Sequence, residues 1–165
     1  MLKPAYFVDN NKLELKIYEA MLLPENKYYR FSLYSWYQND DKSTDEFNGV
    51  NMVSVDPDSD EILGYYTASY NRQSRVISCC SFIKFNKTHI LAKEDLKLFF
   101  EKLINDPLFD KVKFSAILDN PANEVYNYWC KKYNGRVVGT YKNDVVLKDG
   151  KSYDVVSYEF LTKEV

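Results

Sequence analysis

The sequence predicts a mixed α/β fold, with a mostly antiparallel sheet of about six to seven strands flanked by four helices. Three observations predict it. Short segments of alternating apolar residues are separated by tight turns, which indicates antiparallel neighbours. Two longer segments repeat apolar residues at helical spacing. A strand lies between those two helices, which predicts a parallel strand pair with a right-handed crossover.

The first half of the chain predicts two helices and then a meander. A helix is expected from about Asn11 to Leu23, with Asn11 as N-cap and Pro24 as the stop. Its apolar face is expected to hold Leu13, Ile17, Tyr18, Met21 and Leu22. A second helix is expected over about 25–36, followed by an acidic loop over 38–48. Strands are expected at 51–55, 62–71 and 76–85, joined by turns at 56–60 and 72–75.

The second half predicts the alternation of helices and strands. The best helix covers about 92–105, with a stripe of Leu96, Phe99, Phe100, Leu103 and Ile104. A strand over 111–118 follows. Asn120-Pro121 then predicts a helix start, with an inner face of Val125, Trp129 and Tyr133, and Asn134-Gly135 predicts its end. Two last strands are expected at 136–142 and 152–161.

Composition and charge exclude several classes of function. The chain has 165 residues without a linker rich in Gly, Ser or Pro, so we expect one domain over 1–165. The net charge of −2 without a basic stripe argues against a nucleic-acid partner. No apolar run approaches about 20 residues and no signal peptide is evident, so we expect no membrane contact and a cytoplasmic location. The three cysteines lack metal-ligand spacing, so no metal is expected.

Two motifs carry a resemblance to a known family. Residues 61–66 (Glu-Ile-Leu-Gly-Tyr-Tyr) are similar to the opening of that family's third strand, x-h-h-G-y-h, in which h is a hydrophobic residue. Residues 118–126 and 134–139 are similar to its ending, N-x-x-A…Y-x-x-x-G-F-x-x-x-G, and Asp154 lies where many members have an acidic residue. With the order of elements, these motifs make the chain resemble the GNAT acetyltransferase superfamily over nearly its whole length.

The resemblance implies a binding segment for acetyl-coenzyme A. In the family, a loop before a helix cradles the cofactor pyrophosphate with glycine amides. The corresponding residues 85–95 contain no glycine. Side chains and strand backbone would have to supply the donors, which leads to this predicted set of cofactor-binding residues: Phe82, Lys84, Lys87, Thr88, His89, Lys93 and Asn120.

The resemblance also implies a proton donor on the last helix for the departing thiolate. Counting from Asn120 puts the family's tyrosine at Asn127, whereas counting back from Asn134-Gly135 puts it near Cys130. The nearby tyrosines are Tyr126 and Tyr128. Tyr126 is the first candidate because it shares a helix face with Cys130, and a packing role for it stays open.

Two functions follow from the resemblance. The first is transfer of acetyl from acetyl-coenzyme A to an unidentified amine. The second is a non-catalytic role in an assembly with protein partners, for example as a component of a bacteriophage virion, with the protein inside a virus particle assembled in the cytoplasm. Aromatic and arginine side chains favour interfaces. The predicted interface residues are Tyr28, Tyr29, Arg30, Tyr34, Trp36 and Tyr37.

Overall fold

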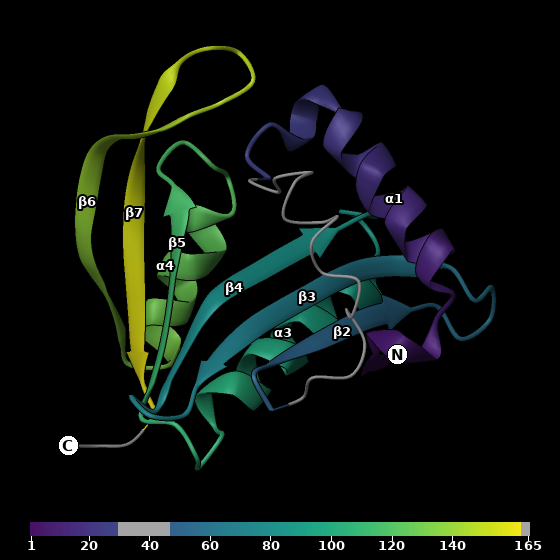
Figure 1. Cartoon of the computed structure of the whole chain (residues 1–165), viewed down its shortest axis with the longest axis horizontal. Helices are drawn as coiled ribbons and strands as arrows, with labels where there is room; N and C mark the ends of the chain where they lie inside the picture. The colour runs from purple at the N-terminus through teal and green to yellow at the C-terminus, as the bar shows by residue number, and fades with distance from the viewer. Residues whose placement is uncertain (30–46, 163–165) are drawn as a thin grey trace. The chain divides into compact units, whose positions relative to one another are not determined.

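The computed structural model describes residues 1–29 and 47–162 (Figure 1). The chain divides into two compact units, Met1–Tyr70 with Cys80–Lys102 and Asn71–Cys79 with Leu103–Val165. Strand pairing joins seven strands in the order β1-β2-β3-β4-β5-β7-β6. The β4–β5 pair is parallel, and the pairs β1–β2, β2–β3, β5–β7 and β6–β7 are antiparallel. The predicted mixed, mostly antiparallel sheet is therefore confirmed. That the chain is a single domain stays a prediction.

The first unit contains most of the elements of the N-terminal half. They are β1 (Leu2–Pro4), the 3-10 helix η1 (Ala5–Phe7), α1 (Asn10–Leu22), the 3-10 helix η2 (Pro24–Asn26), β2 (Gly49–Val55), β3 (Ile62–Asn71), most of β4 (Val76–Lys84) and most of α3 (Ile90–Ile104). The three-residue strand β1 was not predicted, because it is too short to show an alternating pattern. The predicted helix over 25–36 begins where η2 is found, and most of it lies outside the described residues.

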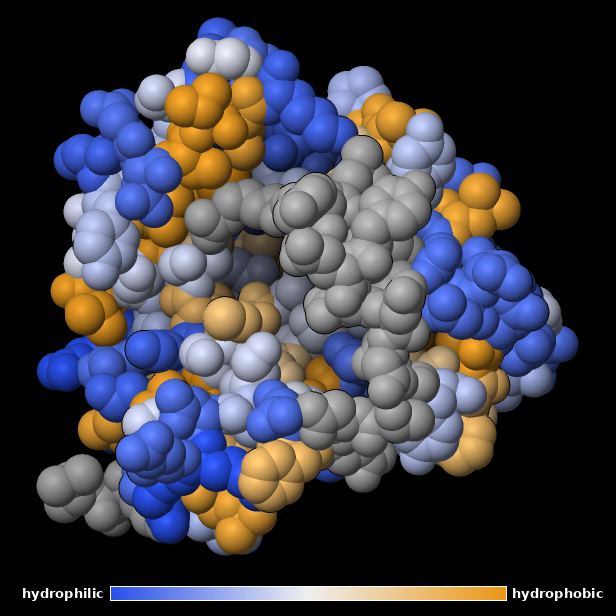
Figure 2. Space-filling model, in the orientation of Figure 1, coloured by the Kyte–Doolittle hydropathy of each residue, from blue (hydrophilic) through white to orange (hydrophobic). Residues whose placement is uncertain are grey.

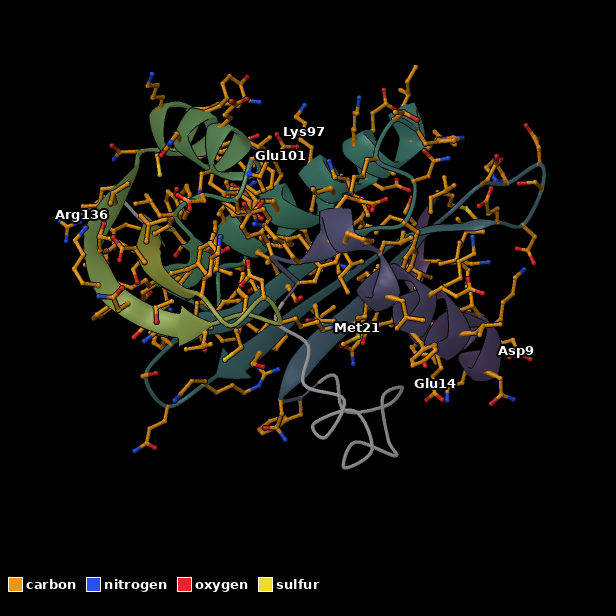
Figure 3. The ribbon with its side chains drawn as sticks, turned by 90° about the horizontal axis from the view of Figure 1, so that it is seen from above. Asp9, Glu14, Met21, Lys97, Glu101 and Arg136 are labelled. Atoms are coloured by element: carbon orange, nitrogen blue, oxygen red, sulfur yellow. The ribbon has the colours of Figure 1, made fainter. Side chains whose placement is uncertain are left out.

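Helix α1 begins one residue earlier than predicted. Its N-cap is Asp9, whose side chain accepts a hydrogen bond from the Lys12 amide at 2.9 Å, so the prediction of Asn11 as the cap is wrong. The buried face consists of Leu13, Ile17, Ala20 and Met21. Tyr18 and Leu22 are exposed, contrary to prediction. Figure 3 shows Met21 pointing toward the strands and Glu14 pointing away from them.

Helices α1 and α3 cover opposite faces of the strands in the first unit (Figures 1 and 3). Successive strand side chains point to opposite faces, and the two neighbours Tyr65 and Tyr66 follow this rule. Tyr65 belongs to the core cluster with Ile17 of α1. Tyr66 instead contacts Phe99 of α3, with 5.8 Å between ring centroids. The whole predicted stripe of α3 is buried.

Gly64 explains the physical basis of the motif in β3. A Cβ at this position would lie 2.8 Å from Cζ of Tyr66 and 3.1 Å from the Ile83 carbonyl oxygen, so a larger residue would displace the Tyr66 ring. The Tyr66 hydroxyl donates a hydrogen bond to the Ala92 carbonyl at 2.8 Å. Glycine at 64 therefore lets Tyr66 connect β3 to the first turn of α3.

The second unit packs one helix on the C-terminal strands. It contains β5 (Lys111–Ile117), α4 (Asn123–Lys132), β6 (Gly135–Val146), β7 (Ser152–Leu161) and the beginning of β4. Aromatic rings form its core: Phe114 lies 5.0 Å from Tyr126 and 5.4 Å from Tyr158, centroid to centroid. Strand β4 joins this unit through two parallel pairs with β5, Val76 with Lys111 and Ile77 with Val112.

Helix α4 begins later than its Asn-Pro signal predicted. The Asn120 side chain accepts from the Ala122 amide at 3.0 Å and thus stabilises a turn that precedes the helix. The helix itself begins at Asn123. Its buried residues are Asn123, Tyr126 and Trp129. Of the predicted inner face, Trp129 is buried and Tyr133 is half-buried, whereas Val125 is 40% exposed, so the prediction is wrong for Val125.

Apolar side chains also reach the surface. On the face shown in Figure 2 they are scattered among hydrophilic ones. Strand β6, at the edge of the sheet, exposes Val137, Val138, Tyr141 and Val146. In the described part of the chain, no helix combines the length and the apolar character needed to cross a membrane.

Candidate functional site

The connection from β4 to α3 carries six of the seven predicted cofactor-binding residues, all within the first unit. Phe82 and Lys84 end β4, and Lys93 lies in the first turn of α3. Lys87, Thr88 and His89 lie in the connection between them. The seventh residue, Asn120, lies in the second unit, in the turn before α4.

Backbone donors in this connection converge on one side chain. The Oδ1 atom of Asn86 accepts from the Thr88 amide at 3.3 Å and from the His89 amide at 3.1 Å. It also accepts from the Thr88 hydroxyl at 3.1 Å. The sequence did not single out Asn86. Its position two residues before Thr88 is typical of an Asx turn, which is the signal that would have found it.

Lys84, Lys87 and Lys93 form a cluster of positive charge around the connection. Burial lowers the pKa of the Lys84 ammonium group, and the charges of Lys93 and Lys87 lower it further. No carboxylate of the described residues pairs with any of these three lysines. Since like charges repel, binding an anion here would relieve an unfavourable interaction.

A tyrosine hydroxyl lies against the backbone at the end of β4. The Tyr29 Oη atom lies 3.4 Å from the Lys84 amide nitrogen and 3.5 Å from its carbonyl oxygen. Burial raises the pKa of Tyr29. Tyr29 was predicted as an interface residue. In the structure Tyr29 packs against the core cluster of the first unit. Its contact with Lys84 joins residues that lie 55 positions apart, and no sequence pattern indicated it.

Two acidic residues near the connection, Asp95 and Asp56, have partners. Asp95 is buried; its carboxylate accepts from the Ser54 hydroxyl at 2.6 Å and lies 3.0 Å from the Met1 amino group. Asp56 lies 3.7 Å from Nε2 of His89, and a hydrogen bond from the Asp58 amide lowers the pKa of Asp56. Over residues 1–29 and 47–162, no group of three or more His, Cys, Asp or Glu side chains is placed to hold a metal ion.

Helix α4 is anchored to β5 by Asn123. Its Nδ2 donates to the carbonyls of Ile117 and Leu118, both at 2.7 Å, and its Oδ1 accepts from the Tyr158 hydroxyl at 2.9 Å. Asn123, three residues after Asn120, is thus the asparagine that joins helix and strand.

The anchoring asparagine gives an alternative starting point for counting along the sequence motif. Counted from Asn123 instead of Asn120, the position of the family's tyrosine moves by three residues, from Asn127 to Cys130, where the count from Asn134-Gly135 also ends. Cys130 is partly buried, and burial raises the pKa of its thiol. Tyr126 is 9% exposed and packs against Phe114, whereas Tyr128 is 58% exposed.

The predicted interface residues are only partly described. Tyr28 is half-buried, with the Lys27 ammonium group 5.0 Å from its ring centroid. Arg30, Tyr34, Trp36 and Tyr37 lie outside the described residues. A contact of this segment with a partner chain stays a prediction.

Comparisons with known proteins were made at the level of sequence and of structure. No protein-family model matches the sequence, and no curated protein matches it. Solved structures do match. A spermidine N-acetyltransferase from Vibrio cholerae in complex with CoA and spermine has a TM-score of 0.69 at 13% identity, and the match covers 98% of this chain and 95% of that chain.

Further acetyltransferases match equally well. An N-acetyltransferase from Staphylococcus aureus Mu50 has a TM-score of 0.70 at 16% identity, covering 99% of this chain and 98% of that one. NAA60 from Arabidopsis thaliana, in complex with a bisubstrate analogue, has a TM-score of 0.64 at 17% identity, covering 98% and 97%. The chain has the GNAT fold. At these identities the similarity shows the fold alone, because a GNAT fold does not by itself fix an activity.

Proposed function

We propose that this chain is an N-acetyltransferase that transfers acetyl from acetyl-CoA to an amine. The observation that carries the proposal is the lysine cluster of Lys84, Lys87 and Lys93 around the β4–α3 connection. It lies in the segment that the GNAT resemblance assigns to the cofactor. A cluster of cations without acidic partners among the described residues fits a ligand that carries several phosphates.

The residues of the connection fit the charge of the cofactor, although the glycines are absent. Lys87 and Lys93 are exposed and would bind phosphate oxygens. Asp95, which follows the first turn of α3, turns its carboxylate inward to Ser54, so its charge is partly neutralised inside the unit. The amides of Thr88 and His89 already converge on one oxygen and would suit an anion at the same point.

Acetyl-CoA, when bound, supplies an acetyl group activated as a thioester. The chain would contribute binding through the lysines and a proton for the leaving sulfur from α4. Cys130 is our first candidate for that proton donor, because the count from Asn123 and the count from Asn134-Gly135 both lead to it, and a cysteine thiol is protonated at neutral pH. Tyr126, the candidate from the sequence, is the second, and its core position makes it less accessible.

The acceptor is an amine of unidentified structure. Two acidic segments of the sequence, 40–46 and 56–61, would favour a cationic acceptor if their carboxylates were free. The first lies outside the described residues. In the second, Glu61 pairs with Lys16 at 2.8 Å and Asp60 lies 3.7 Å from Lys3, so these carboxylates leave little free charge for a substrate.

The experiment is a thermal shift with acetyl-CoA. A ligand that binds only the folded state stabilises it by about 2.7 kcal/mol at a concentration 100 times its Kd. We expect a higher Tm for the natural chain and a smaller shift for Lys87→Gln and Lys93→Gln. Lys131→Gln, which removes an exposed lysine on α4, is the matched control and should keep the full shift.

A second assay follows the release of the CoA thiol in the presence of a panel of amines. If Cys130 is the proton donor, Cys130→Ala should lower the rate of thiol release and leave the Tm shift unchanged. If Tyr126 is the donor, Tyr126→Phe should have these two effects instead. If acetyl-CoA at millimolar concentration produces no shift, the enzymatic proposal is wrong, and the non-catalytic role in an assembly becomes the better hypothesis.

A further inference from the structure

The side chain of Asn86 occupies the point at which three donors of the β4–α3 connection converge. These donors are the amides of Thr88 and His89 and the hydroxyl of Thr88, at 3.3, 3.1 and 3.1 Å from Oδ1. The Asn86 amide itself donates to the Leu63 carbonyl at 3.3 Å, which fixes its backbone on β3. The acceptor at the centre of this group of donors therefore belongs to the chain itself.

A phosphate oxygen would be a better acceptor for the same donors. Thr88 and His89 lie in the connection just before α3, which begins at Ile90, and backbone amides that converge in such a loop can bind anions. Hydrogen bonds to a charged acceptor are about twice as strong as those to a neutral amide oxygen. The three contacts of Asn86 are also at the long end of the normal range, so they hold the donors weakly.

We propose that Asn86 determines the affinity of the chain for phosphate-bearing cofactors, because its amide oxygen stands where a phosphate oxygen binds and must be displaced by it. This inference rests on the proposed function. The cations of Lys84, Lys87 and Lys93 favour the exchange, since they attract a phosphate and do not attract the neutral amide. Asn86 thus acts as an internal competitor of the cofactor.

Two substitutions of Asn86 separate competition from a structural role. Asn86→Ala removes the competing oxygen and leaves the donors free. Asn86→Asp keeps the acceptor and the turn, and adds a negative charge that holds the donors more strongly and repels phosphate. Competition predicts tighter binding for Asn86→Ala and weaker binding for Asn86→Asp. If Asn86 only shapes the loop, the order is reversed, because the alanine variant loses the turn and the aspartate variant keeps it.

The test measures the Kd of CoA and of pantetheine, which lacks the phosphates, by isothermal titration. Loss of one competing hydrogen bond corresponds to about a threefold to tenfold change in Kd. We therefore expect Asn86→Ala to bind CoA about threefold to tenfold more tightly and to bind pantetheine with unchanged affinity. The control is Asn71→Ala, since Asn71 accepts from the Ser74 amide at 2.9 Å in a similar turn away from the connection, and its loss should leave both affinities unchanged.

The outcomes distinguish this inference from the proposed function. Binding of CoA by the natural chain with equal or weaker binding by Asn86→Ala overturns the inference and leaves the proposed function in place. Binding of CoA by Asn86→Ala alone supports the inference and contradicts the proposed function of the natural chain. If neither binds CoA, both are wrong.

Discussion

The anchor of α4 offers a quantitative test of the fold. Asn123→Ala removes three hydrogen bonds, two to the carbonyls of Ile117 and Leu118 and one from the Tyr158 hydroxyl. The Ile117 carbonyl keeps a bond from the Asn120 amide at 3.0 Å, and the Leu118 carbonyl can be hydrated because that residue is 45% exposed. Tyr158 is only 2% exposed, so in Asn123→Ala its hydroxyl loses this acceptor inside the core.

The cost can be estimated from these contacts. A buried hydroxyl without a partner costs about 1–3 kcal/mol, and each lost hydrogen bond about 0.5–1.5 kcal/mol. The carbonyls of Ile117 and Leu118 keep or regain a hydrogen-bond partner, and only the Tyr158 hydroxyl is left without one. We therefore expect Asn123→Ala to lower the free energy of unfolding by about 2–4 kcal/mol. In a Tyr158→Phe background the same substitution should cost about 1–2 kcal/mol less, because no hydroxyl remains to be buried without a partner.

Urea unfolding followed by Trp fluorescence measures both values, since Trp129 lies in the same core. Asn127→Ala, an exposed asparagine on the same helix, is the matched control and should change stability by less than about 0.5 kcal/mol. The reasoning is refuted if Asn123→Ala costs no more than this control, or if its full cost persists in the Tyr158→Phe background.

Two further predictions concern charge and close packing. Glu159 is held by the ammonium group of Lys111 and the guanidinium group of Arg136, which lower its pKa in the folded state. Its contribution to stability is therefore present above the unfolded pKa of about 4.3 and is lost as the pH falls through the folded pKa, so acid should destabilise the natural chain more steeply than Glu159→Gln. A constant difference between them from pH 7 to pH 3, by urea titration, would argue against this pairing. Gly64→Ala should lower the free energy of unfolding by about 1–3 kcal/mol, because the added methyl group overpacks the site. Gly139→Ala is the control and should be nearly neutral in thermal unfolding, because a Cβ at that position meets nothing within 4 Å. Equal effects of the two substitutions would show that the space at Gly64 is not limiting.

The elements with the strongest sequence pattern could be predicted. Helix α3 repeats large apolar residues at every turn, and all five residues of its predicted stripe are buried. The cap of α1 was misplaced because Asp9, Asn10 and Asn11 are all good N-cap residues, and the pattern alone cannot choose between neighbours. The start of α4 was misplaced because Asn120-Pro121 is compatible with a turn as well as with a helix start.

The candidate site was only partly predictable. The lysines around the β4–α3 connection are visible in the sequence because charge is a property of residue type. The role of Asn86 depends on three donors meeting at one atom, which local sequence suggests weakly. The contact of Tyr29 with Lys84 and the anchoring by Asn123 depend on tertiary packing. Residue type therefore predicted Tyr29 only as an interface residue, and the sequence did not single out Asn123.

The most direct test of the proposed function is an isothermal titration of the natural chain with acetyl-CoA, carried out at two salt concentrations. We expect saturable binding that weakens as salt rises, because the lysine cluster would hold the phosphates largely through charge, and salt screens exposed charges. No binding at millimolar acetyl-CoA and low salt would contradict the assignment of this GNAT fold to acetyl transfer.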